Sequence, residues 1–475
     1  MGWFIFILAC VRTTAAPDGP RPPDDTPNDT ASDVLPPETG EPDPADPPDV
    51  ARVRWMLHGG GPEDDDVFRT FVQAANNGHI VTLGALDDGD PGVLAWDAYW
   101  TNLGAASATT VNTADAADGD DPALVARVRT ADALFLRGGD QAAYVERWFG
   151  HALGEAIVEA FERGAVIGGS SAGCAVLGER IYDAREGSVA AWEVLRDGKD
   201  PWLTFTHNPG FGVQGIITDT HVSERGRLPR LAVMLAHQQL DLPDRAWTAL
   251  GLDAQTALFL REDRTGFVVG EGAVTLLRGG DARLRAGAPP DIRAMRLWSL
   301  PAGYSLSLDA VDPVLLRPDW VVPNAPGLAG NFGETDLDGD WLGTHAVGRW
   351  VVEPWSDPYA LLDGQLQLVD GEGVLPDVLV GARVWSDEET VETRLGGLLW
   401  GTAAGDGRIA VALDEGMFAM SLEPRLLAVG PGSAVLTLDA RTAAHRGTRS
   451  TGWQVGALEH AALSIVTDLE PLDLR

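Results

Sequence analysis

Short apolar runs that precede glycine turns recur from Ala51 onward, and this pattern constrains the fold more than any other feature of the sequence. The runs 52–58, 134–136 and 165–167 each come just before a pair or trio of glycines, whereas 67–75 has helical periodicity. Runs of this length without strict alternation are typical of strands buried on both faces. Strand, glycine turn and helix in succession predict an α/β fold, with a mostly parallel sheet and helices on both faces.

The segment 169–173 has the pattern G-x-S-x-G, between an apolar strand and a helical stretch that begins at Cys174. A serine on such a tight turn projects its hydroxyl away from the backbone, and the helix N-terminus offers N–H groups to a developing oxyanion. Active sites in parallel sheets collect at the carboxyl ends of the strands. Ser171 is therefore the candidate nucleophile, although small residues at a turn also produce this pattern by chance.

The candidate base follows a second apolar run. His221 ends the segment Thr218-Asp219-Thr220-His221, and three arginines follow within the next ten residues. Pro229 suits the first turn of a helix, which places Arg227 and Arg230 on one helical face. A histidine at a strand end beside clustered arginines is a better candidate for a general base than an isolated one. Arginines placed in this way also hold carboxylates by paired hydrogen bonds.

Four segments, taken in order, resemble the serine peptidase family that contains cyanophycinase and aspartyl dipeptidase, whose fold is class I glutamine amidotransferase-like. They are Leu-Arg-Gly-Gly-Asp-Gln (136–141), Gly-Gly-Ser-Ser-Ala-Gly (168–173), Asp-Thr-His-Val-Ser-Glu-Arg-Gly-Arg-Leu-Pro-Arg-Leu (219–231) and Gly-Leu-Asp-Ala-Gln-Thr-Ala (251–257). The resemblance implies a serine hydrolase domain over residues 51–310. It implies amide-bond cleavage with no metal and no cofactor.

Carried over residue by residue, the resemblance implies Ser171 as nucleophile and His221 as general base. It also implies an oxyanion hole made of backbone N–H groups and a pocket that binds an aspartyl side chain. The residues expected there are Ala172, Gly139 and Asp140 for the oxyanion hole, and Gln141, Asp219, Arg225, Arg227 and Arg230 for the aspartyl pocket.

Two positions depart from the family pattern. Thr220 stands in place of a glutamine before the histidine, and we expect this change to alter substrate contacts without abolishing catalysis. Ala254 stands in place of the glutamate that orients and charges the histidine, and loss of such an acid costs on the order of 10⁴ in rate. Three interpretations stay open: Asp253 or another acid replaces the glutamate, the chain works slowly as a dyad, or it is a non-catalytic relative.

The first 50 residues predict a leader and a tether. Residues 1–16 include the apolar run MGWFIFILAC, typical of a lipoprotein leader acylated at Cys10 or of a secretory leader cut after Ala15 or Ala16. Residues 17–50 contain 11 Pro and 10 Asp/Glu, which predicts an extended acidic linker. We expect an exported protein, tethered to the cell envelope membrane through Cys10 or released outside the cell.

Charge and cysteine content exclude several classes of protein. The formal net charge of −35, with no compensating basic stripe, excludes nucleic-acid binding. Cys10 and Cys174 are the two cysteines of the sequence, too few for a disulfide framework or a multi-cysteine metal cluster. The family resemblance implies pairing of such domains as a homodimer.

Residues 311–475 predict a β-rich region, either a degenerate copy of the family's C-terminal half or an unrelated accessory domain. The runs 426–430 and 434–438 follow Glu415 in the order in which similar runs follow Asp253. This region has no G-x-S-x-G pattern, and Glu388 stands at the position that corresponds to His221. We therefore expect no second catalytic centre.

These features predict an exported serine peptidase-like hydrolase that cleaves amide bonds next to aspartyl residues. A cyanophycin-type β-aspartyl-arginine polymer is the best-motivated substrate. Ala254 favours the alternative, a surface-tethered relative that binds aspartyl or arginyl peptides without efficient turnover. A hydrolase of some unrelated peptide or ester is the third hypothesis, because a fold does not determine a substrate.

Overall fold

The computed structural model describes residues 50–85 and 96–318 in full. Beyond residue 318 it describes the backbone of several strands up to residue 473, and the side chains of 458–465. The predicted leader and the linker up to residue 49 lie outside the described residues, as do Glu388 and Glu415. Within the described part, no helix is long and apolar enough to cross a membrane.

The first sheet contains nine strands in the order β16-β15-β11-β10-β1-β5-β4-β2-β3. Its parallel half consists of β1 (Val53–His58), β2 (His79–Gly84), β3 (Ser107–Asn112), β4 (Ala133–Leu136) and β5 (Val166–Ser170). Its antiparallel half consists of β10 (Thr256–Arg261), β11 (Thr265–Gly270), β15 (Ser305–Ser307) and β16 (Val314–Leu316).

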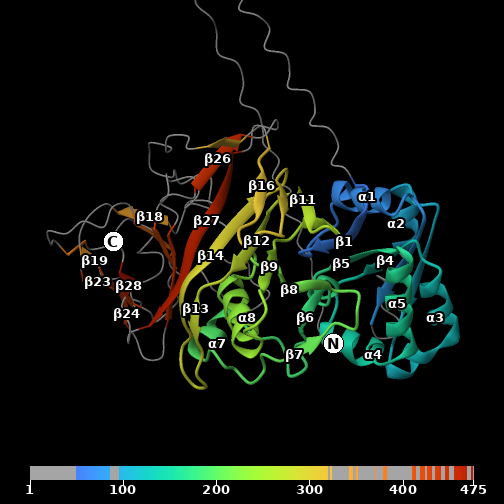
Figure 1. Cartoon of the computed structure of the whole chain (residues 1–475), viewed down its shortest axis with the longest axis horizontal. Helices are drawn as coiled ribbons and strands as arrows, with labels where there is room; N and C mark the ends of the chain where they lie inside the picture. The colour runs from blue at the N-terminus through green and yellow to red at the C-terminus, as the bar shows by residue number, and fades with distance from the viewer. Residues whose placement is uncertain are drawn as a thin grey trace, which may run out of the picture. The chain divides into compact units, whose positions relative to one another are not determined.

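Alternate side chains of the parallel strands enter two different hydrophobic cores. Met56 packs with α1 (Asp65–Ala74) and α2 (Trp96–Asn102) on one face. Leu57 belongs to the core of the other face, which is covered by α3 (Pro122–Arg129), α4 (Gln141–Trp148) and α5 (Ala152–Arg163) (Figure 1). Burial on both faces explains why these strands read as continuous apolar runs. The predicted α/β architecture with helices on both faces is confirmed.

The second sheet contains 14 strands and continues the same arrangement. Three of its strands run parallel beside the candidate site: β6 (Gly178–Tyr182), β8 (Val213–Thr220) and β9 (Thr248–Leu252). Antiparallel neighbours extend it on both sides, namely β7 (Phe205–His207), β12 (Ala273–Arg278), β13 (Asp281–Arg283) and β14 (Asp291–Pro301). The 3-10 helix η2 (Ala116–Asp120) and the helix α6 (Ala172–Ala175) precede these strands in the chain.

The helix α8 (Leu228–Asp241) begins as predicted, with Pro229 in its first turn. Together with α7 (Ala191–Arg196) it contributes to a core on one face of the second sheet. Ile217 of β8 points into this core, whereas the preceding Ile216 points into the core shared with the first sheet. The two sheets are therefore joined through one continuous apolar core, and the strand ends that carry the candidate site meet along it.

The described residues of the C-terminal region beyond residue 318 form strands, as expected. The long strand β27 (Gln454–Thr467) pairs antiparallel with β14, so part of this region extends the second sheet. The other strands are β17 (Val321–Pro323), β18 (Leu342–His345), β19 (Arg349–Trp350), β20 (Leu368–Val369), β21 (Val378–Gly381), β22 (Ile409–Ala412), β23 (Phe418–Leu422), β24 (Arg425–Val429), β25 (Ala434–Asp439), β26 (Ala444–Thr448) and β28 (Leu472–Asp473). An internal repeat stays a prediction.

Candidate active site

Ser171 occupies a strained turn between β5 and α6. Its φ of 51° and ψ of −119° are uncommon for a residue with a side chain. The turn requires glycine on both sides: a Cβ on Gly169 would lie 2.3 Å from the Gly173 carbonyl oxygen, and one on Gly173 would lie 2.0 Å from that of Leu136. Close packing of the backbone therefore forces the serine side chain out at the carboxyl end of β5.

His221 lies against this serine, although 50 residues and two different sheets separate them. Its Nε2 is 3.0 Å from the Oγ of Ser171. The contact depends on α6 packing against β8, where the Thr218 hydroxyl donates to the carbonyl of Cys174 at 3.0 Å. The predicted pair of nucleophile and base is thus assembled where β5 and β8 end.

The glycine run after β1 provides the space for this pair. His221 N–H donates to the Gly59 carbonyl at 3.1 Å. At Gly60, whose φ is +101°, a Cβ would lie 2.2 Å from Nε2 of His221 and 3.0 Å from Cβ of Ser171. No side chain fits there without separating the two reacting groups. The sequence predicts a turn at this run but not that it makes room for the contact between Ser171 and His221. The signal available was the position of three glycines directly after a buried strand.

Burial and neighbouring charge keep His221 neutral. Its pKa is lowered to about 3, first by burial and then by the guanidinium groups of Arg225 and Arg227, with Asp219 opposing them. A neutral imidazole can accept the serine proton at neutral pH. However, no carboxylate of the described residues forms a hydrogen bond or ion pair with His221, so the imidazolium formed during attack lacks a directly bound acid.

Asp253, the candidate replacement acid, is directed elsewhere. Its two carboxylate oxygens accept from the backbone N–H groups of Ser223 and Ala273, each at 3.0 Å. Burial raises its pKa. The carboxylate therefore connects the turn that carries His221 to the start of β12, with no hydrogen bond to the imidazole.

Glu224 is an acid that sequence analysis missed. Its Oε1 accepts from the N–H of Ala254 at 3.0 Å, so its carboxylate lies beside the position where the family's glutamate would be. The signal available in the sequence was an acid three residues after the histidine in a chain that has alanine at position 254.

The three predicted pocket arginines have different surroundings. Arg230 is only 2% exposed and forms a paired contact with Asp219, at 2.9 and 2.7 Å. Arg227 is also buried and donates to the Thr220 carbonyl at 3.1 Å. These contacts hold the strand end before His221. Arg225 is half-buried, and its charge lowers the pKa of His221 more than that of Arg227 does. The role of these arginines in substrate binding stays a prediction.

The loop after β4 lies on the other side of Ser171. A Cβ on Gly138 would be 3.4 Å from Cβ of Ser171, which places the next residues, Gly139 and Asp140, close to the nucleophile. Asp140 caps α4 by accepting from the Ala142 N–H at 2.9 Å. Gln141 is the first residue of that helix, and Ala172 begins α6. Their roles in the oxyanion hole and in substrate binding stay predictions.

His58 is a second residue that sequence analysis missed. Its Nδ1 is 2.9 Å from the Ser170 hydroxyl, and its carbonyl accepts from Ser171 N–H at 3.1 Å. Burial lowers its pKa to about 4, so it supports the turn as a neutral side chain. In the described part of the chain, no three His, Cys, Asp or Glu side chains converge as a metal site would require.

Part of the chain is similar in sequence to known proteins. Residues 96–265 match the model of peptidase family S51. The chain is similar to a cyanophycinase from Synechococcus elongatus, with 26% identity over 280 residues that cover 54% of this chain and 81% of the relative. It is also similar to a cyanophycinase from Geminocystis herdmanii, with 27% identity over 38% of this chain and 61% of the relative. A solved peptidase from an acI-B1 Actinobacterium aligns with a TM-score of 0.38 and 20% identity, over 54% of this chain and 97% of its own.

Proposed function

We propose that this chain, which belongs to peptidase family S51 through residues 96–265, hydrolyses amide bonds next to aspartyl residues by attack of Ser171. The observation that carries the proposal is the 3.0 Å contact between Ser171 Oγ and His221 Nε2, on a turn that forces the serine outward. A chance small-residue turn would not place a neutral imidazole against its hydroxyl.

The chemistry follows from this contact. His221 Nε2 takes the Ser171 proton while Oγ bonds to the substrate carbonyl carbon, and the carbonyl oxygen becomes an oxyanion. Backbone N–H groups of Ala172 and the Gly139-Asp140 turn would donate to that oxyanion. Collapse of the intermediate breaks the C–N bond, and the leaving amine receives the proton from His221. A water molecule then releases the acyl group by the same steps.

The aspartyl specificity rests on charge at the site. Arg225 is the half-buried guanidinium near His221, and an aspartyl carboxylate is the substrate group that it would bind. Both curated relatives above are cyanophycinases, which favours a β-aspartyl-arginine polymer as the substrate.

A second function, binding without efficient turnover, is favoured by Ala254. With alanine at that position and Asp253 bonded to Ser223 and Ala273, the low pKa of His221 makes it a weak base. Slow hydrolysis and pure binding differ in whether product accumulates in the presence of an intact Ser171.

One experiment separates these functions. The full chain is incubated with β-aspartyl-arginine polymer and with aspartyl dipeptides, beside a Ser171→Ala control, and release of Asp-Arg is measured. Hydrolysis requires release that disappears in the control. Equal rates in both samples, together with retention of polymer by the protein, identify the binding function.

Export is part of the same proposal and rests on residues 1–50 alone. A Cys10→Ser variant expressed in a bacterial host tests it by fractionation. Membrane association that is lost in the variant supports acylation, release into the medium by both forms supports a cleaved secretory leader, and retention of both in the cytosol contradicts export. Light scattering of the purified chain tests the expected homodimer.

A further inference from the structure

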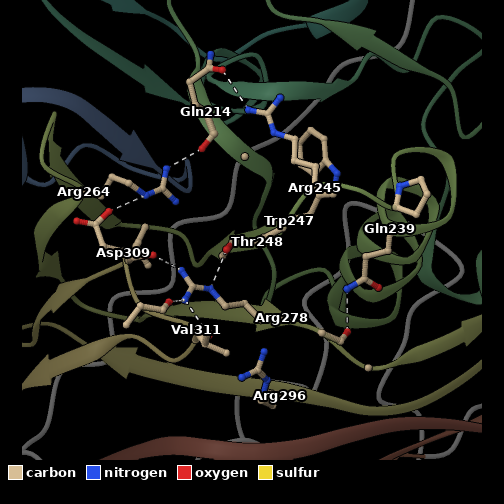
Figure 2. A pocket seen from close by; sticks show the side chains of 17 residues that line it. Gln214, Gln239, Arg245, Trp247, Thr248, Arg264, Arg278, Arg296, Asp309 and Val311 are labelled. Atoms are coloured by element: carbon tan, nitrogen blue, oxygen red, sulfur yellow. Dashed lines mark hydrogen bonds and ion pairs between the residues drawn. The ribbon is translucent and has the colours of Figure 1, made fainter.

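A separate pocket lies at the ends of β8 and β9 remote from His221. It has a volume of about 660 Å³, and its lining includes Gln214 near the start of β8 and Thr248 at the start of β9 (Figure 2). His221 follows β8 and is seven residue steps along the chain from Gln214, which at about 3.3 Å per residue corresponds to roughly 23 Å. The pocket is therefore distinct from the candidate active site.

The lining is strongly cationic in a chain whose net charge is −35. Four arginines and one aspartate line it, a formal charge of +3 from these five side chains. The guanidinium groups come from different elements and approach one cavity (Figure 2). Their positions are Arg245 before β9, Arg264 in the turn between β10 and β11, Arg278 at the end of β12 and Arg296 on β14.

Arg278 is the buried centre of this group, with 6% of its surface exposed. It donates to the Thr248 hydroxyl at 2.8 Å and to the carbonyls of Leu308, Ala310 and Val311 at 2.9, 2.6 and 3.2 Å. These acceptors are neutral, so they satisfy its N–H groups without cancelling its charge. Burial, followed by repulsion from Arg264 and Arg296, lowers its pKa to about 10.

The other arginines are held in place but keep part of their surface open to the cavity. The side chains of Arg264 and Arg296 are 30% and 29% exposed. Arg264 donates to the Gln214 carbonyl at 2.8 Å and lies 3.4 Å from a carboxylate oxygen of Asp309. Arg296 is paired with Asp312.

Arg245 is paired with Glu179 and donates to the Gln214 side chain at 3.2 Å, with its guanidinium 5.2 Å from the centre of the Trp247 ring. Glu179 and Asp312 pair with two of the arginines and add two negative charges to that of the lining aspartate. The four arginines and these three acids together have a formal charge of +1.

We propose that this arginine pocket is a binding site for a small anion that carries two or more carboxylates. Guanidinium groups fixed by neighbouring contacts bind carboxylates with little further loss of side-chain entropy. Because the arginines enter the cavity from several elements, a ligand with separated carboxylates engages more of them than a single oxyanion does. The proposal does not depend on the activity of Ser171.

The test titrates the full chain with citrate, succinate or inorganic phosphate at constant ionic strength, by calorimetry and by thermal unfolding. We expect saturable binding of citrate or succinate, and at least tenfold weaker binding by Arg264→Gln and by Arg296→Gln. Two variants are used so that one remains informative if the other fails to fold, and circular dichroism checks each. Arg129→Gln is the matched control, because Arg129 pairs with Glu159 on the surface of α3, outside the pocket.

Three outcomes overturn the proposal. The first is the absence of saturable binding of both carboxylates. The second is affinity unchanged in the two pocket variants, or reduced equally in the Arg129→Gln control. The third is binding of phosphate as tight as that of citrate and succinate, which indicates a site for one oxyanion.

Discussion

Restoring a glutamate at position 254 is the sharpest test of the candidate active site. The segments that carry His221 and residue 254 both contact the glycine run 59–61. His221 N–H donates to the Gly59 carbonyl at 3.1 Å, Gln255 N–H donates to the Gly60 carbonyl at 2.7 Å, and a Cβ on Gly61 would be 2.9 Å from that of Ala254. A glutamate side chain at this position therefore comes within reach of the imidazole. We expect Ala254→Glu to accelerate hydrolysis.

The size of the gain follows from electrostatics. Opposite unit charges 4 Å apart interact by about 4 kcal/mol at an effective dielectric of 20, which equals about three powers of ten in rate. Burial, followed by the charges of Arg225 and Arg227, lowers the pKa of His221 to about 3, and a paired carboxylate acts against these effects by stabilising the imidazolium. The carboxylate of Glu224, already bonded to the N–H of residue 254, repels a second acid and reduces the gain. We therefore expect an increase of roughly 10² to 10³ in kcat, below the value of about 10⁴ for complete loss of a triad's acid.

The assay measures Asp-Arg release from β-aspartyl-arginine polymer as a function of pH. Ala254→Gln is the matched control, because it adds the same volume without the charge. In Ala254→Glu we also expect the acidic limb of the pH profile to move to higher pH, since the pKa of His221 rises. If the Glu and Gln variants both fold and both retain the rate of the unchanged chain, the missing acid does not limit this site and the reasoning is wrong.

Three further predictions concern the supports of the site. Gly60→Ala should lower labelling of Ser171 by a serine-reactive probe at least 100-fold, since its Cβ would lie 2.2 Å from His221 Nε2; unchanged labelling of a folded variant would contradict the geometry. Asp219→Ala removes the carboxylate that pairs with the buried Arg230 and should lower the free energy of unfolding in urea by about 3–5 kcal/mol. Glu159→Ala removes an exposed ion pair and should lower the free energy of unfolding by less than about 1 kcal/mol. Folding lowers the pKa of His58 to about 4 and that of His221 to about 3, so below pH 6.5 the unfolded chain binds more protons than the folded chain. The stability that these neutral histidines contribute is therefore complete above pH 6.5 and is lost as the pH falls toward 4. The loss from His58 alone amounts to up to about 3 kcal/mol. Unfolding measured from pH 7.5 to 4 checks this, and a stability that increases on acidification would refute it.

Several elements of the site could be predicted because their signals are local. The apolar run before Gly168 and the small residues after it specify a strand and a tight turn within ten residues, and the structure has β5 and Ser171 there. Pro229 marked the start of α8 for the same reason, because a proline constrains its own backbone and that of its neighbour.

Other features depend on contacts between distant segments. The sequence does not indicate that the carboxylate of Asp253 faces Ser223 and Ala273, because that direction is decided by how β9 and β12 meet the turn after β8. The sequence did not predict the position of Glu224 for the same reason, because its hydrogen bond with the N–H of residue 254 joins positions 30 residues apart.

The sequence by itself determined the α/β class, the two-sided burial of the parallel strands and the outward serine, because apolar periodicity and glycine turns act over a few residues. Only the tertiary structure decided that His221 contacts Ser171 through the space left at Gly60, and that arginines from four separate segments line one pocket. Such arrangements follow from the packing of two sheets on a shared core, and no short segment of the chain encodes them.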